Sequence, residues 1–182
     1  MKLRYSNLDL DKTVGRSCFF DANILLFLFF TTTPYQEWQK HYSPMFSQLL
    51  HQRNPLYIDF LVLSEVINRE LRIQYELYLW ENKLSKKNMR FKDYRNSELG
   101  NENLEHIYKV IETKIFSLFE FDVKDFSLKE VKDFMTTDPL DFNDKAIERL
   151  CKENNMILFT DDKDYARSEI EIISTNPSII GM

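Results

Sequence analysis

The chain has 182 residues, 43% of them hydrophobic, which is enough for one domain with a substantial core. Only three glycines and five prolines exclude a linker-rich or low-complexity protein, and the net charge of -5 argues against a protein that coats nucleic acid through general electrostatics. A nuclease stays compatible with this charge, because an acidic metal site lowers the net charge while a local basic patch binds phosphates.

Cysteine usage and the apolar segments indicate a cytoplasmic protein. Cys18 and Cys151 lie in apolar segments, and their spacing matches neither a disulfide framework nor a metal site. The most apolar run, residues 18–30, is too short and too polar to cross a membrane, since it contains Asp21 and Asn23. No basic segment with a cleavage site precedes it, so we expect neither a signal peptide nor a membrane span.

The N-terminal part predicts one strand that ends on an acid. We expect an irregular arm over the first fifteen residues, a buried strand over residues 17–21, and a turn into a buried helix or loop over residues 22–30. An ionised aspartate beside so much apolar sequence is costly unless something pairs with it. Asp21 is therefore either satisfied by backbone N–H groups or part of a functional site.

Two segments with proline predict short helices. Thr33 before Pro34 and Ser43 before Pro44 each place an N-cap residue ahead of proline at the first helical position. Two helices should therefore follow one another, ending near Arg53.

A second strand is expected over residues 55–59, followed by a long helix with one apolar stripe. Glu65 lies in the first turns of that helix, so a second carboxylate comes shortly after a second strand. The alternative for Glu65 is an ion pair with Arg69 at i, i+4, worth roughly 0.2–0.5 kcal/mol.

The pattern breaks over residues 81–95, where basic side chains cluster. They are Lys83, Lys86, Lys87, Arg90, Lys92 and Arg95. Such a run could bind RNA phosphates, with Phe91 and Tyr94 available to stack on unpaired bases. The alternative is a solvated helix end and loop.

Strands and helices alternate along the rest of the chain. We expect a helix over residues 104–118, a strand over 119–123, a short helix opened by the capping box of Ser127 and Glu130, and a last strand over 170–173, with regular structure ending at residues 176–177. This alternation predicts an α/β fold, a single domain with a central parallel sheet flanked by helices on both faces. Residues 75–119 form a helical, basic insertion in it.

A helix, a turn and a strand between residues 141 and 164 have acids at both ends. Apolar residues recur at helical spacing over residues 146–151, and residues 156–159 suit a buried parallel strand. Sites in open α/β sheets form outside the carboxyl ends of strands, so Asp162 and Asp144 could share one site. Alternatively, Asp144 only favours the first turn of a helix, and Asp161, Asp162 and Asp164 form a solvated turn.

Four carboxylates thus lie next to strand or helix ends: Asp21, Glu65, Asp144 and Asp162. Such a cluster repels itself unless a cation neutralises it. With no histidine or cysteine among the ligands, the oxygen atoms suit a hard cation, Mg²⁺ or Mn²⁺. An ion of this kind can promote the hydrolysis of a phosphodiester.

The ordered set resembles the PIN-domain family, which includes the VapC-type ribonuclease toxins of toxin–antitoxin pairs. Residues 20–23 (Phe-Asp-Ala-Asn) look like the family's opening strand with its first acid, and residues 61–65 resemble the helix that bears the second. Residues 144–147 (Asp-Lys-Ala-Ile) look like the third-acid motif, and residues 159–162 (Phe-Thr-Asp-Asp) resemble the closing Thr-x-Asp. The resemblance covers most of the chain, but Asp141 and Asp161 are additional acids that could replace their neighbours as ligands.

The chemistry and the resemblance together predict a metal-dependent endoribonuclease. Asp21, Asp144 and Asp162 would hold the metal, Glu65 would bind it or orient the attacking water, and Asn23 and Thr160 would support the acids by hydrogen bonds. The resemblance also implies a 5′-phosphate product, a homodimer and an antitoxin protein as partner.

Two other functions stay open. A phosphatase of the haloacid dehalogenase type also begins with an aspartate after its first strand, but it needs a second aspartate two residues later, where this chain has Asn23. A non-catalytic RNA-binding or interaction module of the PIN fold is the other, because a fold alone does not establish activity.

Overall fold

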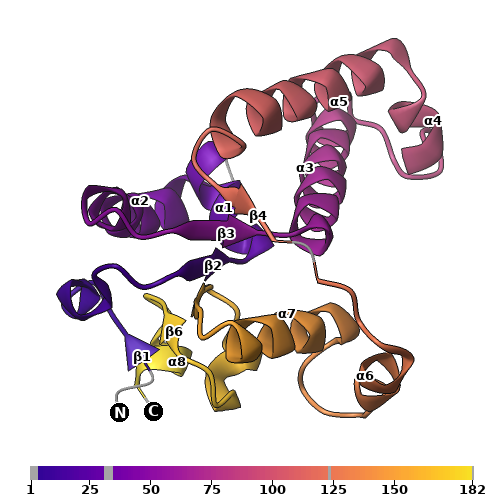
Figure 1. Ribbon diagram of the computed structural model, residues 1–182. Helices are drawn as coiled ribbons and strands as arrows, with labels where there is room; N and C mark the ends of the chain where they lie inside the picture. The colour runs from indigo at the N-terminus through magenta and orange to yellow at the C-terminus, as the bar shows by residue number, and fades with distance from the viewer. Residues whose placement is uncertain (1–3, 31–34, 123, 182) are drawn as a thin grey trace.

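The computed structural model describes residues 4–30, 35–122 and 124–181, which form a six-stranded sheet with helices packed on it (Figure 1). The strands are β1 (Arg4–Tyr5), β2 (Cys18–Phe20), β3 (Leu56–Ile58), β4 (Glu120–Phe121), β5 (Ile157–Phe159) and β6 (Ile172–Ile173). Their order is β1-β6-β5-β2-β3-β4, and all neighbouring pairs are parallel. The α/β fold predicted from the sequence is confirmed.

Helices cover both faces of this sheet, as the sequence predicted. They are α1 (Ala22–Phe29), α2 (Gln36–His51), α3 (Phe60–Glu81), α4 (Phe91–Arg95), α5 (Glu98–Val110), α6 (Leu128–Asp133), α7 (Phe142–Glu153) and α8 (Pro177–Ile180), with the short turns η1 (Leu10–Thr13), η3 (Ile111–Ile115) and η4 (Lys163–Arg167). In Figure 1, α2 and α3 lie above β2 and β3, whereas α7 lies below them.

The direction of chain winding reverses between β2 and β5. From β2 the chain crosses to β3 on one side, and it later returns to place β5 on the other side of β2. The register puts Phe20 opposite Phe159, so Asp21 and Thr160 follow at the same edge. Ligands of open α/β sheets bind at such a reversal, outside the carboxyl ends of the strands.

The core around these two strands is aromatic and closely packed. Every residue of β2 and β5 is buried. The ring of Phe20 makes edge contacts with Phe46, Phe119 and Phe159 at centroid distances of 5.8, 4.8 and 5.0 Å. Burying each such side chain contributes about 1.5–3 kcal/mol, so the residues at the ends of these strands stand on a rigid base.

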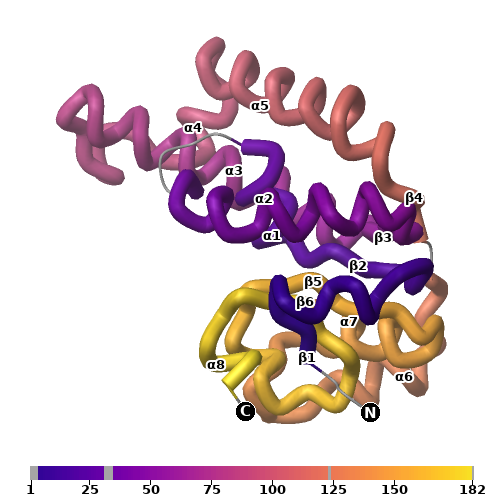
Figure 2. Tube along the Cα trace, turned by 90° about the vertical axis from the view of Figure 1, so that its left-hand side faces the viewer, coloured from indigo at the N-terminus to yellow at the C-terminus, as the bar shows by residue number. Residues whose placement is uncertain are grey.

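The long segment between β3 and β4 forms a helical arm. Its helices α3, α4 and α5 extend away from the sheet, with α4 at the far end of α3 (Figures 1 and 2). The rings of Tyr75 and Tyr78 contact Tyr94 at 5.4 and 5.3 Å and join α3 to α4. A Cβ atom at Gly100 would lie 2.0 Å from the carbonyl oxygen of Tyr94, so the tight approach of α4 to α5 requires glycine there.

The two helices expected around residues 34–53 are one helix. α2 continues through Pro44, and Ser43 caps nothing. The proline removes one hydrogen bond, but the buried stripe of Tyr42, Met45 and Leu49 on the same helix offsets this loss. The other expected cap, residues 33–34, lies outside the described residues.

Expectations for both chain ends were also wrong. The N-terminal arm contains β1, which pairs with β6, and the turn η1. Asn176 does not end the regular structure but caps α8, since its side chain accepts from the Ser178 N–H at 3.0 Å. The N-terminal strand gains its stability from a partner more than 160 residues away, which no local pattern reveals.

Both cysteines are buried and free, in line with their apolar surroundings in the sequence. Within the described residues, none of the helices is at once long enough and apolar enough to cross a bilayer.

Candidate active site

Asp21 lies at the carboxyl end of β2 and caps α1. Its Oδ1 accepts a hydrogen bond from the Ala22 N–H at 2.6 Å. Its Oδ2 accepts from the Asn23 amide at 2.6 Å and from the Thr160 hydroxyl at 2.5 Å. The side chain is buried, with 6% of its surface exposed. Three donors therefore fix the orientation of a carboxylate that solvent hardly reaches.

Burial raises the pKa of Asp21 from its ordinary value to about 7, against the lowering effect of the Thr160 hydrogen bond. The charges of Glu65 and Asp144 raise this pKa further. Both carboxylates are therefore near enough to repel Asp21. Three of the four acids selected from the sequence, Asp21, Glu65 and Asp144, thus influence one another at the end of β2.

Asn23 and Thr160 join the ends of β2 and β5. The Thr160 hydroxyl oxygen accepts from the Asp162 N–H at 3.0 Å, and the Asn23 carbonyl oxygen accepts from the Asp161 N–H at 3.2 Å. These two residues therefore hold Asp21 and the loop after β5 in one hydrogen-bonded unit. Their contacts match the supporting position that the sequence predicted.

The structure gives Asp144 and Asp141 different positions relative to the site. The two form a capping box at the start of α7, in which the Asp141 carboxylate accepts from the Asp144 N–H at 2.9 Å and the Asp144 carboxylate accepts from the Asp141 N–H at 3.1 Å. Asp141 is exposed. Burial raises the pKa of Asp144 to about 6, with contributions from the charges of Asp141 and Asp162. Asp144 is therefore partly buried within reach of the charge of Asp162, whereas the exposed Asp141 caps the helix.

A similar distinction holds for the two acids after β5. The Tyr42 hydroxyl donates a short hydrogen bond to Asp161, and the Asp161 carbonyl accepts from the Asn176 amide at 2.6 Å. Asp162 instead acts on Asp144 through its charge, while its Oδ1 accepts from the Asp164 N–H at 2.9 Å. Asp161 thus stabilises the loop, and Asp162 belongs to the acid cluster, by which we mean Asp21, Glu65, Asp144 and Asp162.

Glu65 forms the ion pair with Arg69 that the sequence offered as the alternative to a role in the site. Its carboxylate pairs with Arg69 at 2.9 Å, and its charge also acts on Asp21. The ion pair is partly exposed and contributes little stability. The ion pair with Arg69 orients the Glu65 side chain at the margin of the cluster.

Sequence reasoning missed Tyr165. This residue is completely buried under the cluster, and its hydroxyl donates to Asp144 Oδ1 at 3.0 Å. Burial raises its pKa well above the ordinary value, and the charges of Asp21 and Asp144 add to the rise. The chain has nine tyrosines, and nothing local distinguishes this one.

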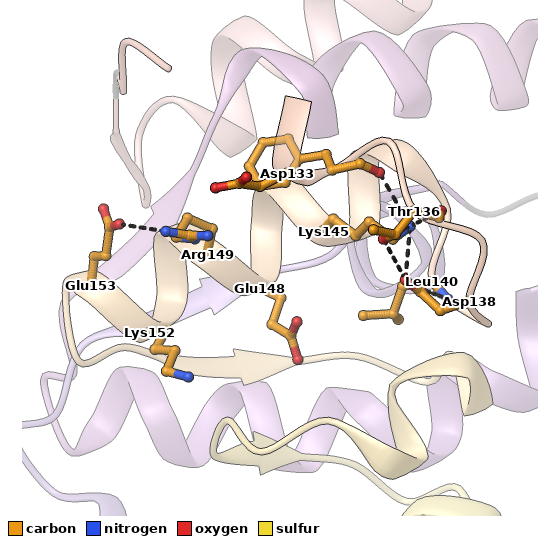
Figure 3. A pocket seen from close by; sticks show the side chains of 10 residues that line it. Asp133, Thr136, Asp138, Leu140, Lys145, Glu148, Arg149, Lys152 and Glu153 are labelled. Carbon is orange, nitrogen blue, oxygen red and sulfur yellow. Dashed lines mark hydrogen bonds and ion pairs between the residues drawn. The ribbon is translucent and has the colours of Figure 1, made fainter. Parts of the chain in front are cut away.

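Lys145 was also missed. Its ammonium donates to the carbonyl oxygens of Phe134 and Thr136 at 3.2 and 2.6 Å and pairs with Asp138 at 3.0 Å. It thereby ties the connection between α6 and α7 to the first turn of α7. Figure 3 shows this contact at one end of a cavity of about 540 Å³, with Arg149 and Glu153 paired at the other end.

The chemistry of the cluster suits a hard divalent cation. All four side chains offer oxygen ligands, and burial is the main cause that raises the pKa values of Asp21 and Asp144. Among the described residues, no three acidic, histidine or cysteine side chains are gathered at metal-ligand distance. Carboxylates that repel one another approach closely when a cation neutralises them.

The basic run lies far from this cluster. Lys83 follows the C-terminal end of α3, whereas Glu65 lies near its start, and the helix between Glu65 and Glu81 spans about 24 Å. Within the run, Arg90 pairs with Asp93 at 2.7 Å and Lys86 with Glu76 at 3.3 Å. A contact of the run with RNA would therefore be remote from the acids, and it stays a prediction.

The sequence matches no protein-family model, and no curated protein matches it either. The resemblance to PIN domains therefore stays a prediction from the order of the motifs in the sequence.

Proposed function

We propose that this protein is a metal-dependent endoribonuclease of the PIN type. The observation that carries the proposal is that Asp21 and Asp162 follow the neighbouring parallel strands β2 and β5 and are joined through Thr160, while the charges of Glu65 and Asp144 act on the buried Asp21. A cation bound by these acids would offset their mutual repulsion.

Each residue has a distinct task in this proposal. Asp21, Asp144 and Asp162 would hold Mg²⁺ or Mn²⁺ through oxygen, and Thr160 and Asn23 keep Asp21 in position. When bound, the ion would polarise the phosphodiester and lower the pKa of the attacking water.

Glu65 completes the site at its margin. Its pair with Arg69 directs the carboxylate, which would bind the ion or accept a proton from the attacking water. Arg69 would supply a positive charge for the substrate phosphate.

The choice of a nuclease over a phosphatase of the haloacid dehalogenase type rests on Asn23. Its amide donates to Asp21 and cannot serve as the general acid that such a phosphatase needs two residues after its nucleophile. RNA as the substrate, a 5′-phosphate product and an antitoxin partner follow from the family resemblance and belong to this proposal.

The proposal also includes a homodimer. Among the described residues β4 is an edge strand of the sheet, and Phe116, Leu118 and Phe121 expose apolar surface at or next to it. A second copy could cover this edge. Light scattering at micromolar concentration should give twice the chain mass, whereas a single species of monomer mass would contradict the dimer.

The test is cleavage of a mixed panel of structured and unstructured RNA with Mn²⁺ or Mg²⁺. We expect cleavage by the native protein that is lost with EDTA and in the Asp21→Asn and Asp144→Asn variants. Asp141→Asn and Asp161→Asn are matched controls that remove a neighbouring acid and should keep most activity. Absence of cleavage and of metal binding in the folded protein would favour the non-catalytic binding module.

A further inference from the structure

A second cavity, of about 420 Å³, opens directly beside the acid cluster. It shares Asp162 with the cluster, and side chains from α1, α2, α3 and η4 line it. Its volume lies in the range of small-molecule sites and is sufficient for one nucleotide. The function of this cavity has to be argued from what its walls offer.

One wall is aromatic. The indole of Trp38 stacks on the ring of Phe27 with centroids 5.6 Å apart and 20° between the planes. Trp38 nevertheless keeps 44% of its surface exposed, while Phe27 is buried. The cavity therefore presents a large planar side chain that is held in place from behind. Such surfaces stack on unpaired bases.

Tyr35 also belongs to the lining. Its hydroxyl is buried and has no hydrogen-bond partner among the described residues, so a polar ligand that reached this group would satisfy it.

Two basic side chains, Arg69 and Lys163, also line the cavity, next to the carboxylates of Asp161 and Asp162. Arg69 belongs to the wall and also pairs with Glu65 of the acid cluster. Lys163 follows Asp162 directly and lies on the same wall. Positive charges between a cavity and a hydrolytic centre suit the phosphates on either side of a nucleoside.

We propose that this cavity is a subsite for one unpaired nucleotide of the RNA substrate, with its base stacked on Trp38 and its phosphates held by Arg69 and Lys163. The inference rests on the proposed nuclease function and adds to it the recognition of single-stranded RNA at this position. A base within a duplex is covered by its neighbours and could not stack on Trp38.

The two tryptophans of the chain allow a direct test. Trp38 lines the cavity, whereas Trp80 is 79% exposed near the C-terminal end of α3, about 22 Å along the helix from Glu65. In the Asp144→Asn background, which prevents cleavage, Trp80→Phe leaves Trp38 as the only indole and Trp38→Phe leaves Trp80. Each protein is titrated in Mg²⁺ with a fluorescein-labelled hexauridylate and with hexamers that lack one base.

RNA should quench the emission of Trp38 and leave that of Trp80 unchanged. A base missing at one position of the hexamer should abolish the quenching. Trp38→Ala should raise the Kd, measured by anisotropy, by about 5- to 150-fold, the equivalent of one lost stack. Trp80→Ala is the control and should bind like the background protein, and Trp38→Phe should recover most of the affinity.

Two results would overturn the inference in distinguishable ways. If the hexamer binds and the native protein cleaves RNA, but Trp38 emission and the Kd of Trp38→Ala do not change, the subsite is wrong while the nuclease proposal stands. If the native protein neither binds nor cleaves RNA, both are wrong.

Discussion

Asp21 connects the stability of the protein to pH. In the folded state burial raises its pKa to about 7 from the ordinary 3.8, against the Thr160 hydrogen bond. An acid whose pKa is higher in the folded state holds its proton more tightly there, so without metal the free energy of unfolding should fall as pH rises from about 4 to about 7. Protonation of Asp21 would also displace a bound cation. The affinity for metal should therefore decrease as the pH decreases.

The Asp21→Asn variant tests whether the charge of Asp21 lowers the free energy of unfolding at high pH. In EDTA at pH 8 it should be more stable than the native protein by roughly 1–3 kcal/mol, because a neutral side chain replaces a buried charge at the cost of one mismatched donor. At pH 5 the difference should nearly vanish. Urea unfolding at both pH values measures it, and a gain of equal size at both would show that charge is not the cause.

Tyr165 positions Asp144 in our interpretation. Tyr165→Phe removes the hydrogen bond to Asp144 Oδ1 and keeps the buried ring. We expect a 10- to 100-fold loss of Mn²⁺ affinity or of cleavage, the usual effect of removing a group that orients a ligand. Calorimetric titration with Mn²⁺ gives the affinity.

Tyr42→Phe is the matched control for Tyr165→Phe. Tyr42 is also completely buried, but its hydroxyl binds Asp161, which lies outside the acid cluster. This variant should lose stability and keep its affinity for Mn²⁺. Equal losses of metal affinity in both variants would mean that packing, and not the Asp144 contact, is responsible.

At the scale of whole elements, the start of α7 depends on Lys145. Lys145→Met leaves the carbonyls of Phe134 and Thr136 without their donor and Asp138 without its partner, and should cost about 2 kcal/mol of stability. The connection it holds leads straight into Asp141 and Asp144, so metal affinity should also fall.

Lys152→Met is the control for Lys145→Met, since Lys152 is an exposed residue of α7 on the same cavity. It should leave both thermal stability and Mn²⁺ affinity unchanged. If Lys145→Met is destabilised but binds Mn²⁺ normally, the connection between α6 and α7 supports the fold without placing the acids.

The elements that the sequence predicts well are those with local signals. The capping box of Ser127 and Glu130, the apolar stripe of α7 and the buried run of β5 all have a pattern within a few neighbouring residues. Asp21, Asp144 and Asp162 could be selected in the same way, since each stands at the end of such an element.

What the sequence could not predict depends on contacts between distant segments. β1 needs β6, the continuity of α2 through Pro44 needs the core beneath it, and the task of Tyr165 needs α7 and η4 in place. The same holds for the choice of Asp162 over Asp161, which depends on Tyr42 of α2. Local propensity yields to tertiary packing in each case.

At the scale of the whole molecule, the acid cluster lies where two halves of the sheet meet. Strands β1, β6 and β5 form one half and β2, β3 and β4 the other, and within the sheet of the described residues the pairing of β5 with β2 joins them. Asp21 follows β2 and belongs to one half. Asp162 follows β5, and Asp144 lies on α7, which packs against β5, so both belong to the other half. A cation held by these acids would therefore link the halves in addition to neutralising them.

Metal binding should accordingly stabilise the entire fold. A ligand that binds only the folded state adds about 2.7 kcal/mol at a concentration 100 times its Kd, so Mn²⁺ at that level should shift the urea midpoint upward by the corresponding amount. Asp144→Asn should lose most of this shift, and Asp11→Asn, which removes an exposed acid of η1, should keep it. A shift of the same size in Asp144→Asn would place the binding of Mn²⁺ elsewhere on the surface, and the acids at the junction of the two halves would then need another explanation.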